Sequence, residues 1–182
     1  MAKLVSKTYG DALFEVAVED GSVDSLAEEV ESVLTIFSDN EDYIKVLNHP
    51  KIPMEEKNSL IKEAFEGKVS NDLLGLMLTV VDKGRFSEIE EILNYFLSCV
   101  RGYKKIGTAT VTSAVTLSEA EKAKVEKRLL ETTAYESFLL EYQVDKSLIG
   151  GMIIKIGDRV VDSSIRTKLN NMARELSKVQ IS

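Results

Sequence analysis

One stretch near the C-terminal end of the chain, residues 147–179, constrains the fold more tightly than any other. It opens with the pair Gly150-Gly151, followed by an apolar run of strand length, Met152–Ile156. Gly157-Asp158 then separates this run from a second β-favouring run that ends at Asp162. Glycine followed by aspartate between two such runs predicts a tight β-hairpin, because one residue of the turn must adopt a positive φ.

The predicted hairpin leads into an amphipathic helix. Its apolar residues recur at steps of four and three, which places them along one face of a helix. They are Ile165, Leu169, Met172, Leu176 and Val179. Ser163 or Ser164 precedes this run and can cap the helix, because a serine hydroxyl accepts a hydrogen bond from a backbone N–H of the first turn.

The first hundred residues show helical periodicity throughout. Apolar residues recur at three- and four-residue steps in six segments, and glycine or proline separates most of them. The second segment, residues 23–37, has a clean apolar stripe. Its acidic run, Glu28, Glu29 and Glu31, is expected to form a solvated face. The fifth segment, residues 73–81, is so apolar that it is expected to lie centrally in a bundle.

Beyond these helices the pattern changes from helix to strand. The β-branched run at residues 108–116 predicts a strand. Ser118, with Glu121 three residues later, forms a capping box and opens a further helix. A second strand is expected from Phe138 to Val144. Together with the hairpin and the last helix, these elements follow the order β-α-β-β-β-α.

The sequence therefore predicts a mainly α fold with two domains. Residues 1–105 form an N-terminal six-helix bundle, and residues 106–182 form a small α+β C-terminal domain. The two differ in charge, since the first carries 12 Lys or Arg against 20 Asp or Glu and the second carries 11 against 10. No basic residue occurs between Thr8 and Ile44. Because a negative surface repels phosphate groups, nucleic acid is excluded as a partner of the first domain.

Residue types that carry catalysis are scarce in this chain. The single His49 and the single Cys99 lie in different segments, whereas a zinc site or a Cys–His site needs more ligands or partners. The sequence lacks the Gly-rich loop of nucleotide-binding proteins, and Gly150-Gly151 lacks the third glycine of a dinucleotide site. The carboxylates fall on solvent faces of predicted helices. We therefore expect no active site, no metal and no cofactor.

The same composition bears on the cellular compartment. No apolar run reaches the roughly 18 residues needed to cross a bilayer, so direct membrane insertion is not expected. The first twenty residues lack the apolar block of a secretory signal. Cys99 has no second cysteine with which to form an internal disulfide, which agrees with a reducing compartment. We expect a cytoplasmic protein.

Two predicted helices carry more apolar surface than a single core-facing stripe requires. On the first and the fifth helix these residues are Val5, Tyr9, Ala12, Leu13, Val16, Leu76, Thr79 and Val80. Two helices of this kind can form a groove for an amphipathic helix of another protein. The alternative is that all eight side chains belong to the core of the bundle, and the sequence leaves both possibilities open.

Residues 145–169 resemble the C-terminal signature of the δ subunit of bacterial F-type ATP synthases, the homologue of the mitochondrial oligomycin-sensitivity-conferring protein. The matching positions include Asp145-Lys146-Ser147, Leu148 to Lys155, Gly157-Asp158, Val161-Asp162, Ser164-Ile165-Arg166 and Leu169. Ser163 departs from the pattern, since many relatives have glycine there. Weaker matches in the first half are Lys7 to Phe14, Asn48-His49-Pro50 and Lys83-Gly84-Arg85.

This resemblance implies a non-enzymatic stator subunit that links the catalytic head to the peripheral stalk. It implies that the N-terminal helices of the α subunits bind the groove between the first and fifth helices, where Tyr9 offers an apolar ring with a polar tip. It also implies that the C-terminal ends of the b subunits bind the basic C-terminal domain. The signature residues expected there are Gly150, Gly151, Gly157, Asp158, Asp162 and Arg166. The chain would then be a peripheral protein on the cytoplasmic face of the bacterial cell membrane.

Two other classes of function remain open at this level. A general helix-binding adaptor, unrelated to ATP synthase, would use the same groove for other helices. An enzyme with a carboxylate-based site would lose turnover, without losing binding, when one carboxylate is replaced.

Overall fold

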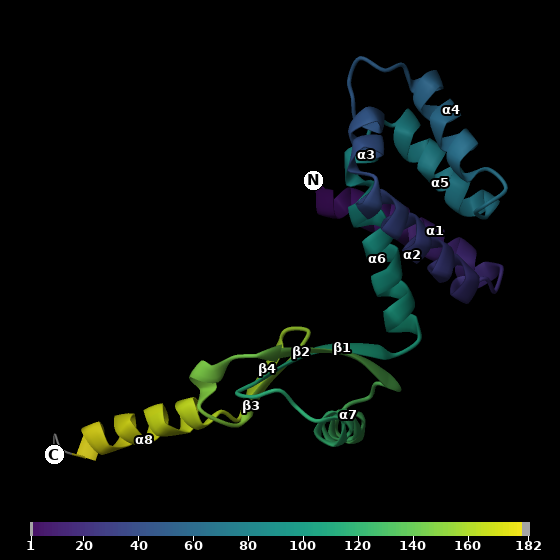
Figure 1. Ribbon diagram of the computed structural model, residues 1–182. Coiled ribbons are helices and arrows are strands. Elements are labelled where there is room, and N and C mark those ends of the chain that lie inside the picture. The colour runs from purple at the N-terminus through teal and green to yellow at the C-terminus, as the bar shows by residue number, and fades with distance from the viewer. Residues whose placement is uncertain (1, 180–182) are drawn as a thin grey trace. The chain divides into compact units, whose positions relative to one another are not determined.

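The computed structural model describes residues 2–179 and divides the chain into two compact units, Met1–Arg101 and Gly102–Ser182 (Figure 1). The first unit is helical, as predicted, with six α-helices among its described residues. They are α1 (Ala2–Glu19), α2 (Val23–Asp39), α3 (Glu41–Leu47), α4 (Met54–Phe65), α5 (Asn71–Asp82) and α6 (Ile89–Tyr103), with a 3-10 turn, η1 (Phe86–Glu88), before α6.

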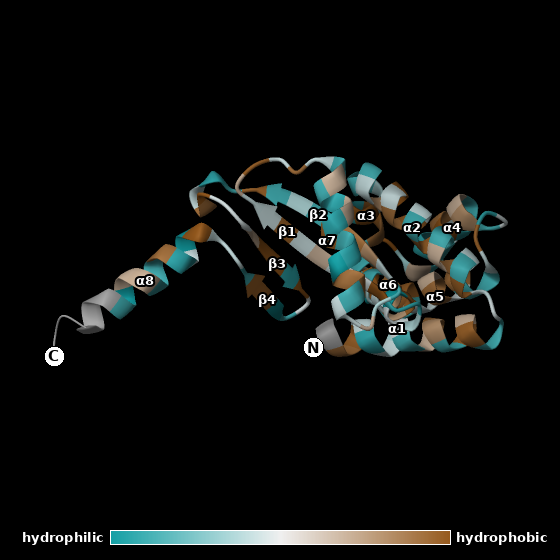
Figure 2. Ribbon diagram, turned by 90° about the horizontal axis from the view of Figure 1, so that it is seen from below, coloured by the Kyte–Doolittle hydropathy of each residue, from teal (hydrophilic) through white to brown (hydrophobic). Residues whose placement is uncertain are grey.

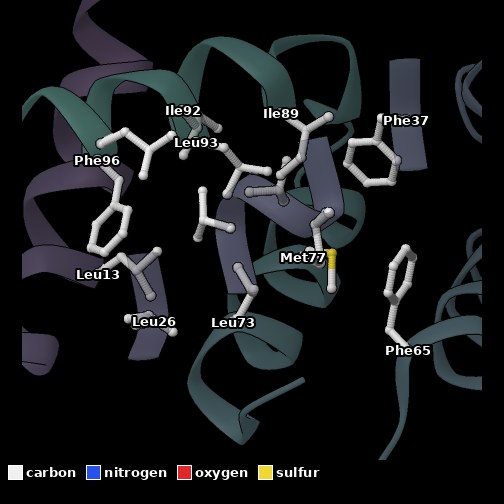
Figure 3. Close-up of a cluster of buried hydrophobic side chains, with 14 of the residues drawn as sticks. Leu13, Leu26, Phe37, Phe65, Leu73, Met77, Ile89, Ile92, Leu93 and Phe96 are labelled. Atoms are coloured by element: carbon white, nitrogen blue, oxygen red, sulfur yellow. The ribbon is translucent and has the colours of Figure 1, made fainter. Parts of the chain in front are cut away.

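The core of this unit is built from the predicted apolar stripes. Figure 3 shows its buried side chains, which come from α1, α2, α4, α5 and α6. Phe37 of α2 lies edge-on to Phe65 of α4 and to Phe86, with ring centroids 5.9 and 6.0 Å apart. Leu73 and Met77 of α5 are fully buried, whereas Gly75 and Thr79 on the same helix are exposed, so this apolar helix contributes to the core with one face only.

Two details of the first unit could not be expected from local sequence patterns. Gly10 lies in the middle of α1, where a β-carbon would come 2.5 Å from the Tyr95 ring of α6. The glycine thus lets two helices approach closely, which accounts for its place inside a helix despite its low helical propensity. Glu29, expected on a solvated face, is instead half-buried and accepts a hydrogen bond from the backbone N–H of Ser70 at 2.8 Å.

The second unit is a small mixed sheet with helices, as predicted. Its elements are β1 (Ile106–Ser113), α7 (Glu119–Thr132), β2 (Ser137–Val144), a 3-10 turn η2 (Lys146–Leu148), β3 (Met152–Ile156), β4 (Arg159–Asp162) and α8 (Ile165–Val179). The strand order is β2-β1-β3-β4, with β1 and β2 parallel and the other two pairs antiparallel. A parallel pair needs a crossover, which α7 supplies.

Helix α7 covers one face of this sheet. Val125 and Leu129 of α7 pack with Val111 of β1 and Phe138 of β2 in a second buried cluster. The capping box predicted at the start of α7 is confirmed, since the Glu121 carboxylate accepts hydrogen bonds from the backbone N–H and from the hydroxyl of Ser118 at 2.8 and 2.7 Å.

The predicted hairpin and its helix are also confirmed. Strands β3 and β4 pair antiparallel, and Gly157 in the turn has a φ of +54°. Ser164 caps α8, because its hydroxyl accepts a hydrogen bond from the N–H of Thr167 at 3.2 Å. The apolar stripe of α8 is exposed to solvent, since Ile165, Leu169 and Met172 are 42%, 52% and 59% exposed. The side chains of Leu176 and Val179 lie outside the described part of the chain.

Candidate docking surfaces

Helices α1 and α5, which carry the eight residues predicted to form a groove, lie against each other in the first unit. The structure divides these residues by burial. Val5, Leu13 and Val80 belong to the core, Tyr9 and Leu76 are half-buried, and Ala12, Val16 and Thr79 are exposed. Only the last five can therefore contribute area to a surface that another protein could contact.

Two exposed residues of α1 extend this surface and were missed from the sequence. Leu4 is 71% exposed and Thr8 is also exposed, so that Leu4, Thr8, Ala12 and Val16 follow one another at steps of four along the helix. The four-residue spacing was the available signal, but it was obscured because α1 is apolar around more than half of its circumference. We call this set, together with Tyr9, Gly75, Leu76 and Thr79, the α1–α5 surface.

The two threonines of the α1–α5 surface have their hydroxyls satisfied within their own helices. The Thr8 hydroxyl donates to the carbonyl of Leu4 at 2.9 Å, and the Thr79 hydroxyl donates to the carbonyl of Gly75 at 2.7 Å. Both threonines can therefore meet a partner without leaving an unpaired hydroxyl. A β-carbon on Gly75 would touch no neighbouring atom, so α5 presents bare backbone there and another helix can approach closely.

Titratable side chains near α1 form a hydrogen-bonded cluster rather than a reactive centre. The Tyr95 hydroxyl donates to the Asp11 carboxylate at 3.0 Å, and the Cys99 thiol lies 3.9 Å from the same oxygen. Burial and the Asp11 carboxylate raise the pKa of Tyr95 to about 12. Burial also raises the pKa of the Cys99 thiol. Both groups stay protonated at neutral pH and lack the thiolate or phenolate of a nucleophile.

The signature residues of the second unit build the junction between the hairpin and α8. A β-carbon on Gly151 would lie 2.5 Å from the carbonyl oxygen of Ser163, and Gly151 has a φ of +75°. Asp162 accepts hydrogen bonds from the N–H of Ser164 at 2.8 Å and from the hydroxyl of Thr167 at 2.7 Å. Arg166 donates to the Ser147 hydroxyl at 2.8 Å.

The other three signature residues occupy simpler places. Gly150 lies under Ile165, whose terminal methyl would be 2.6 Å from a β-carbon there. Gly157 and Asp158 form the exposed turn of the hairpin. Most of the signature residues therefore have a structural role in the junction. The candidates for contact with a partner are the residues that the junction leaves exposed to solvent.

Ile149 is an exposed apolar residue at this junction, and it was not predicted from the sequence as a site residue. It has a φ of +67° and is 66% exposed, although a β-branched residue is rarely found at positive φ. Its neighbours hold it there, since Leu148 is fully buried and the carbonyl of Gly150 accepts a hydrogen bond from Ile165 at 2.9 Å. No local pattern indicates this conformation, because a positive φ would be expected at Gly150 instead.

Ile149 and the exposed stripe of α8 share one part of the second unit. Apolar and polar residues alternate along α8 in Figure 2, and its stripe begins at Ile165, beside the loop that carries Ile149. Exposed basic residues accompany the stripe on α8 at Lys168 and Arg174. We call Ile149, Ile165, Leu169 and Met172 the α8 surface.

Within residues 2–179, His, Cys, Asp and Glu side chains do not gather in threes as metal ligands would. None of the described helices has the length and apolar character required to cross a membrane.

Comparison with known proteins identifies the family of the chain. A family model described as "ATP synthase delta (OSCP) subunit" matches residues 5–176. The chain is 51% identical over 181 residues to the ATP synthase subunit delta of Lachnoclostridium phytofermentans, covering 100% of both chains. It is 36% identical over 172 residues to the subunit delta of Halalkalibacterium halodurans, covering 94% of both.

A solved structure supports the fold independently. One chain of the mitochondrial ATP synthase hexamer of Toxoplasma gondii superposes with a TM-score of 0.72 at 19% identity, over 94% of this chain and 96% of that one. The family match over nearly the whole length sets aside an unrelated adaptor and a carboxylate enzyme. The chain belongs to the ATP synthase delta (OSCP) subunit family and is a non-catalytic stator component of F-type ATP synthase.

Proposed function

We propose that the two units of this stator subunit dock on different partners, the first on the catalytic head and the second on the peripheral stalk. The observation that carries the proposal is that each unit exposes an apolar surface that its own fold does not cover. These are the α1–α5 surface in the first unit and the α8 surface in the second.

The α1–α5 surface fits the N-terminal helix of an α subunit. Its small residues, Thr8, Ala12, Gly75 and Thr79, let a third helix approach closely, while Leu4 and Val16 supply apolar area. A helix that packs its own apolar face here buries both stripes without leaving the hydroxyl of Thr8 or Thr79 unpaired. The half-buried Tyr9 lies at the boundary between this surface and the core.

The α8 surface fits the C-terminal ends of the b subunits. Leu169 and Met172 are more than half exposed, and the surrounding charge is positive, so an amphipathic helix with acidic flanks is favoured. In the assembled enzyme the subunit would lie on the cytoplasmic face of the membrane as a peripheral protein.

Mechanically, such a subunit holds the head still while the rotor turns. Torque that is not resisted would turn the head with the rotor, and ion flow would no longer drive or be driven by nucleotide chemistry. The demand is a slowly dissociating interface built from a few well-packed apolar contacts. Two docking units on one chain add avidity, because the second contact becomes intramolecular once the first is made.

Calorimetric titration of the full chain with a synthetic peptide of the α-subunit N-terminus tests the proposal. We expect saturable binding with a negative heat-capacity change, and no binding of a scrambled peptide. Ala12→Asp should weaken the affinity at least tenfold, because it places a charge in the contact. Ala123→Asp, at an exposed alanine of α7, is the matched control and should bind as the wild type does. Equal affinities of these two variants would remove the α1–α5 surface from the proposal.

A further inference from the structure

A groove on another side of the first unit lies between α2 and α4. It has a volume of about 660 Å³, within the range of natural ligand pockets. One wall is a stripe of α2 that runs from Ser25 to Asn40, which at the rise of an α-helix is roughly 22 Å long. The other wall is the end of α4 and the residues after it, from Ala64 to Val69. We call it the α2–α4 groove.

The middle of the α2–α4 groove is apolar. Val33 and Phe65 form part of its floor and are 1% and 3% exposed, while Ile36 on the rim is 43% exposed. Because Ile36 is exposed beside this apolar floor, a partner that covers it would bury apolar area, and this burial favours binding.

The charge along the α2–α4 groove has one dominant sign. Helix α2 carries five acidic residues and no basic residue, and Glu28 and Glu29 line the groove. Lys68 is the single cation among the residues that line it, and its ammonium group donates to the carbonyl of Ala64 at 2.9 Å. A ligand with acidic groups would be repelled along this wall, whereas a basic one would be attracted.

The walls of the α2–α4 groove are fixed before anything binds. Figure 3 shows Phe65 and Phe37 side by side at one end of the buried cluster, edge-on at 5.9 Å. The Tyr43 hydroxyl donates to the carbonyl of Leu60 at 3.1 Å, and the Glu29 carboxylate ties α2 to the N–H of Ser70 at 2.8 Å. A groove held open in this way requires little ordering when it binds a partner.

The α2–α4 groove is separate from the surface proposed for the head. None of the residues that line it belongs to α1 or α5. The effect of a substitution in the α2–α4 groove on binding can therefore be measured without altering the α1–α5 surface, and the reverse also holds.

We propose that the α2–α4 groove binds a basic amphipathic helix of a partner protein. The elongated stripe of α2 matches about four turns of a second helix laid along it. The apolar face of that helix covers Ile36 and the floor around Phe65, and its Lys or Arg residues lie beside Glu28 and Glu29. This site goes beyond the two contacts proposed above and does not depend on either.

The test is a titration of the full chain, labelled with ¹⁵N, with a synthetic helical peptide that carries Leu on one face and Lys on the other. A peptide with Glu in place of every Lys is the control. We expect the basic peptide to bind, to perturb the amide signals of α2 and of the end of α4, and to bind more weakly as salt rises. Absence of binding, or equal binding of the acidic peptide, would overturn the proposal.

Four variants locate the bound peptide. Ile36→Asp and Glu28→Lys should each weaken binding at least tenfold, and both sites are exposed enough for the chain to fold, which circular dichroism checks. Thr35→Asp and Glu31→Lys make the same changes of charge at exposed positions of α2 outside the groove and should leave the affinity unchanged. If Ile36→Asp binds as the wild type does, the groove is not the site.

A fifth variant separates this site from the head contact. Ala12→Asp, on the α1–α5 surface, should leave binding of the basic peptide intact. Loss of binding in that variant would show that the peptide occupies the α1–α5 surface, and the α2–α4 groove would be refuted while the proposed function would stand.

Discussion

Ile149 adopts a backbone conformation that is unfavourable in free energy, and contacts within its own fold do not offset this. Positive φ at a non-glycine residue costs on the order of 1–3 kcal/mol, and the exposed side chain recovers little of it by packing within the chain. Buried Leu148 and the hydrogen bond between Ile165 and Gly150 hold the loop in place. A compensating gain would come from a partner that covers the side chain.

Replacement of Ile149 by glycine tests this account. Glycine removes the steric cost at positive φ but loses more backbone entropy on folding, so we expect a net stabilisation of roughly 0.5–1 kcal/mol. Binding of the soluble part of the b subunits should weaken at the same time, because the apolar contact is gone. Denaturation in urea and calorimetric titration measure the two effects.

The control for Ile149→Gly is Lys105→Gly, at the other non-glycine residue with positive φ. It also relieves a positive φ but lies outside the α8 surface, so it should leave binding of the b subunits unchanged. A less stable Ile149→Gly chain with normal binding would mean that the isoleucine serves the fold and not the partner.

At the scale of elements, the junction between β4 and α8 depends on one carboxylate. Hydrogen bonds from Thr167 and Ser164 hold the pKa of Asp162 below its ordinary value of 3.8. A depressed pKa means that the folded state favours the ionised form, so the stabilisation is complete above that ordinary value. It is lost as the pH falls through the pKa of the folded state.

Replacement of Asp162 by asparagine should therefore change the pH dependence of stability. As the pH falls below 3.8, the wild type should lose the stability that ionised Asp162 contributes. Asp162→Asn should be less stable than the wild type at pH 7 but should lose less stability over the same pH interval. Melting temperatures followed by circular dichroism at several pH values measure both effects. Asp158→Asn, in the exposed hairpin turn, is the matched control. Identical pH profiles of wild type and Asp162→Asn would contradict the role of this cap.

At the scale of the whole molecule, the proposed function assigns the subunit two docking surfaces, one on each of its compact units. When one contact is weakened, the other still keeps the chain near both partners, so the loss from a single substitution is partly compensated. When both are weakened, no such compensation remains. The proposed function therefore predicts a combined effect larger than either single effect.

Membrane vesicles that contain ATP synthase with Ala12→Asp, Leu169→Asp or both would reveal this effect. We expect each single variant to lower ATP-driven ion translocation partly, and the double variant to abolish it while ATP hydrolysis continues, since the subunit has no catalytic role. Leu169 is 52% exposed, so its replacement should spare the fold. Translocation at the wild-type level in the double variant would refute docking through these two surfaces.

The sequence by itself determined the elements and the family. The hairpin around Gly157, a serine cap at Ser163 or Ser164 and the apolar stripe of α2 follow from rules that act over a few residues. All three are found in the structure, where Ser164 is the cap. The signature at residues 145–169 likewise identified the family, because it is read residue by residue along the chain.

Only the tertiary structure decided which apolar residues are core and which remain outside. Val5 and Leu13 are buried whereas Leu4 and Ala12 on the same helix are exposed, because burial depends on the neighbours of α1 and not on its own periodicity. The same holds for Glu29, whose carboxylate meets the N–H of Ser70 from a distant segment, and for Ile149, whose φ is set by packing on both sides. Contacts between segments far apart in the chain leave no local pattern, and they determine which surfaces remain for a partner.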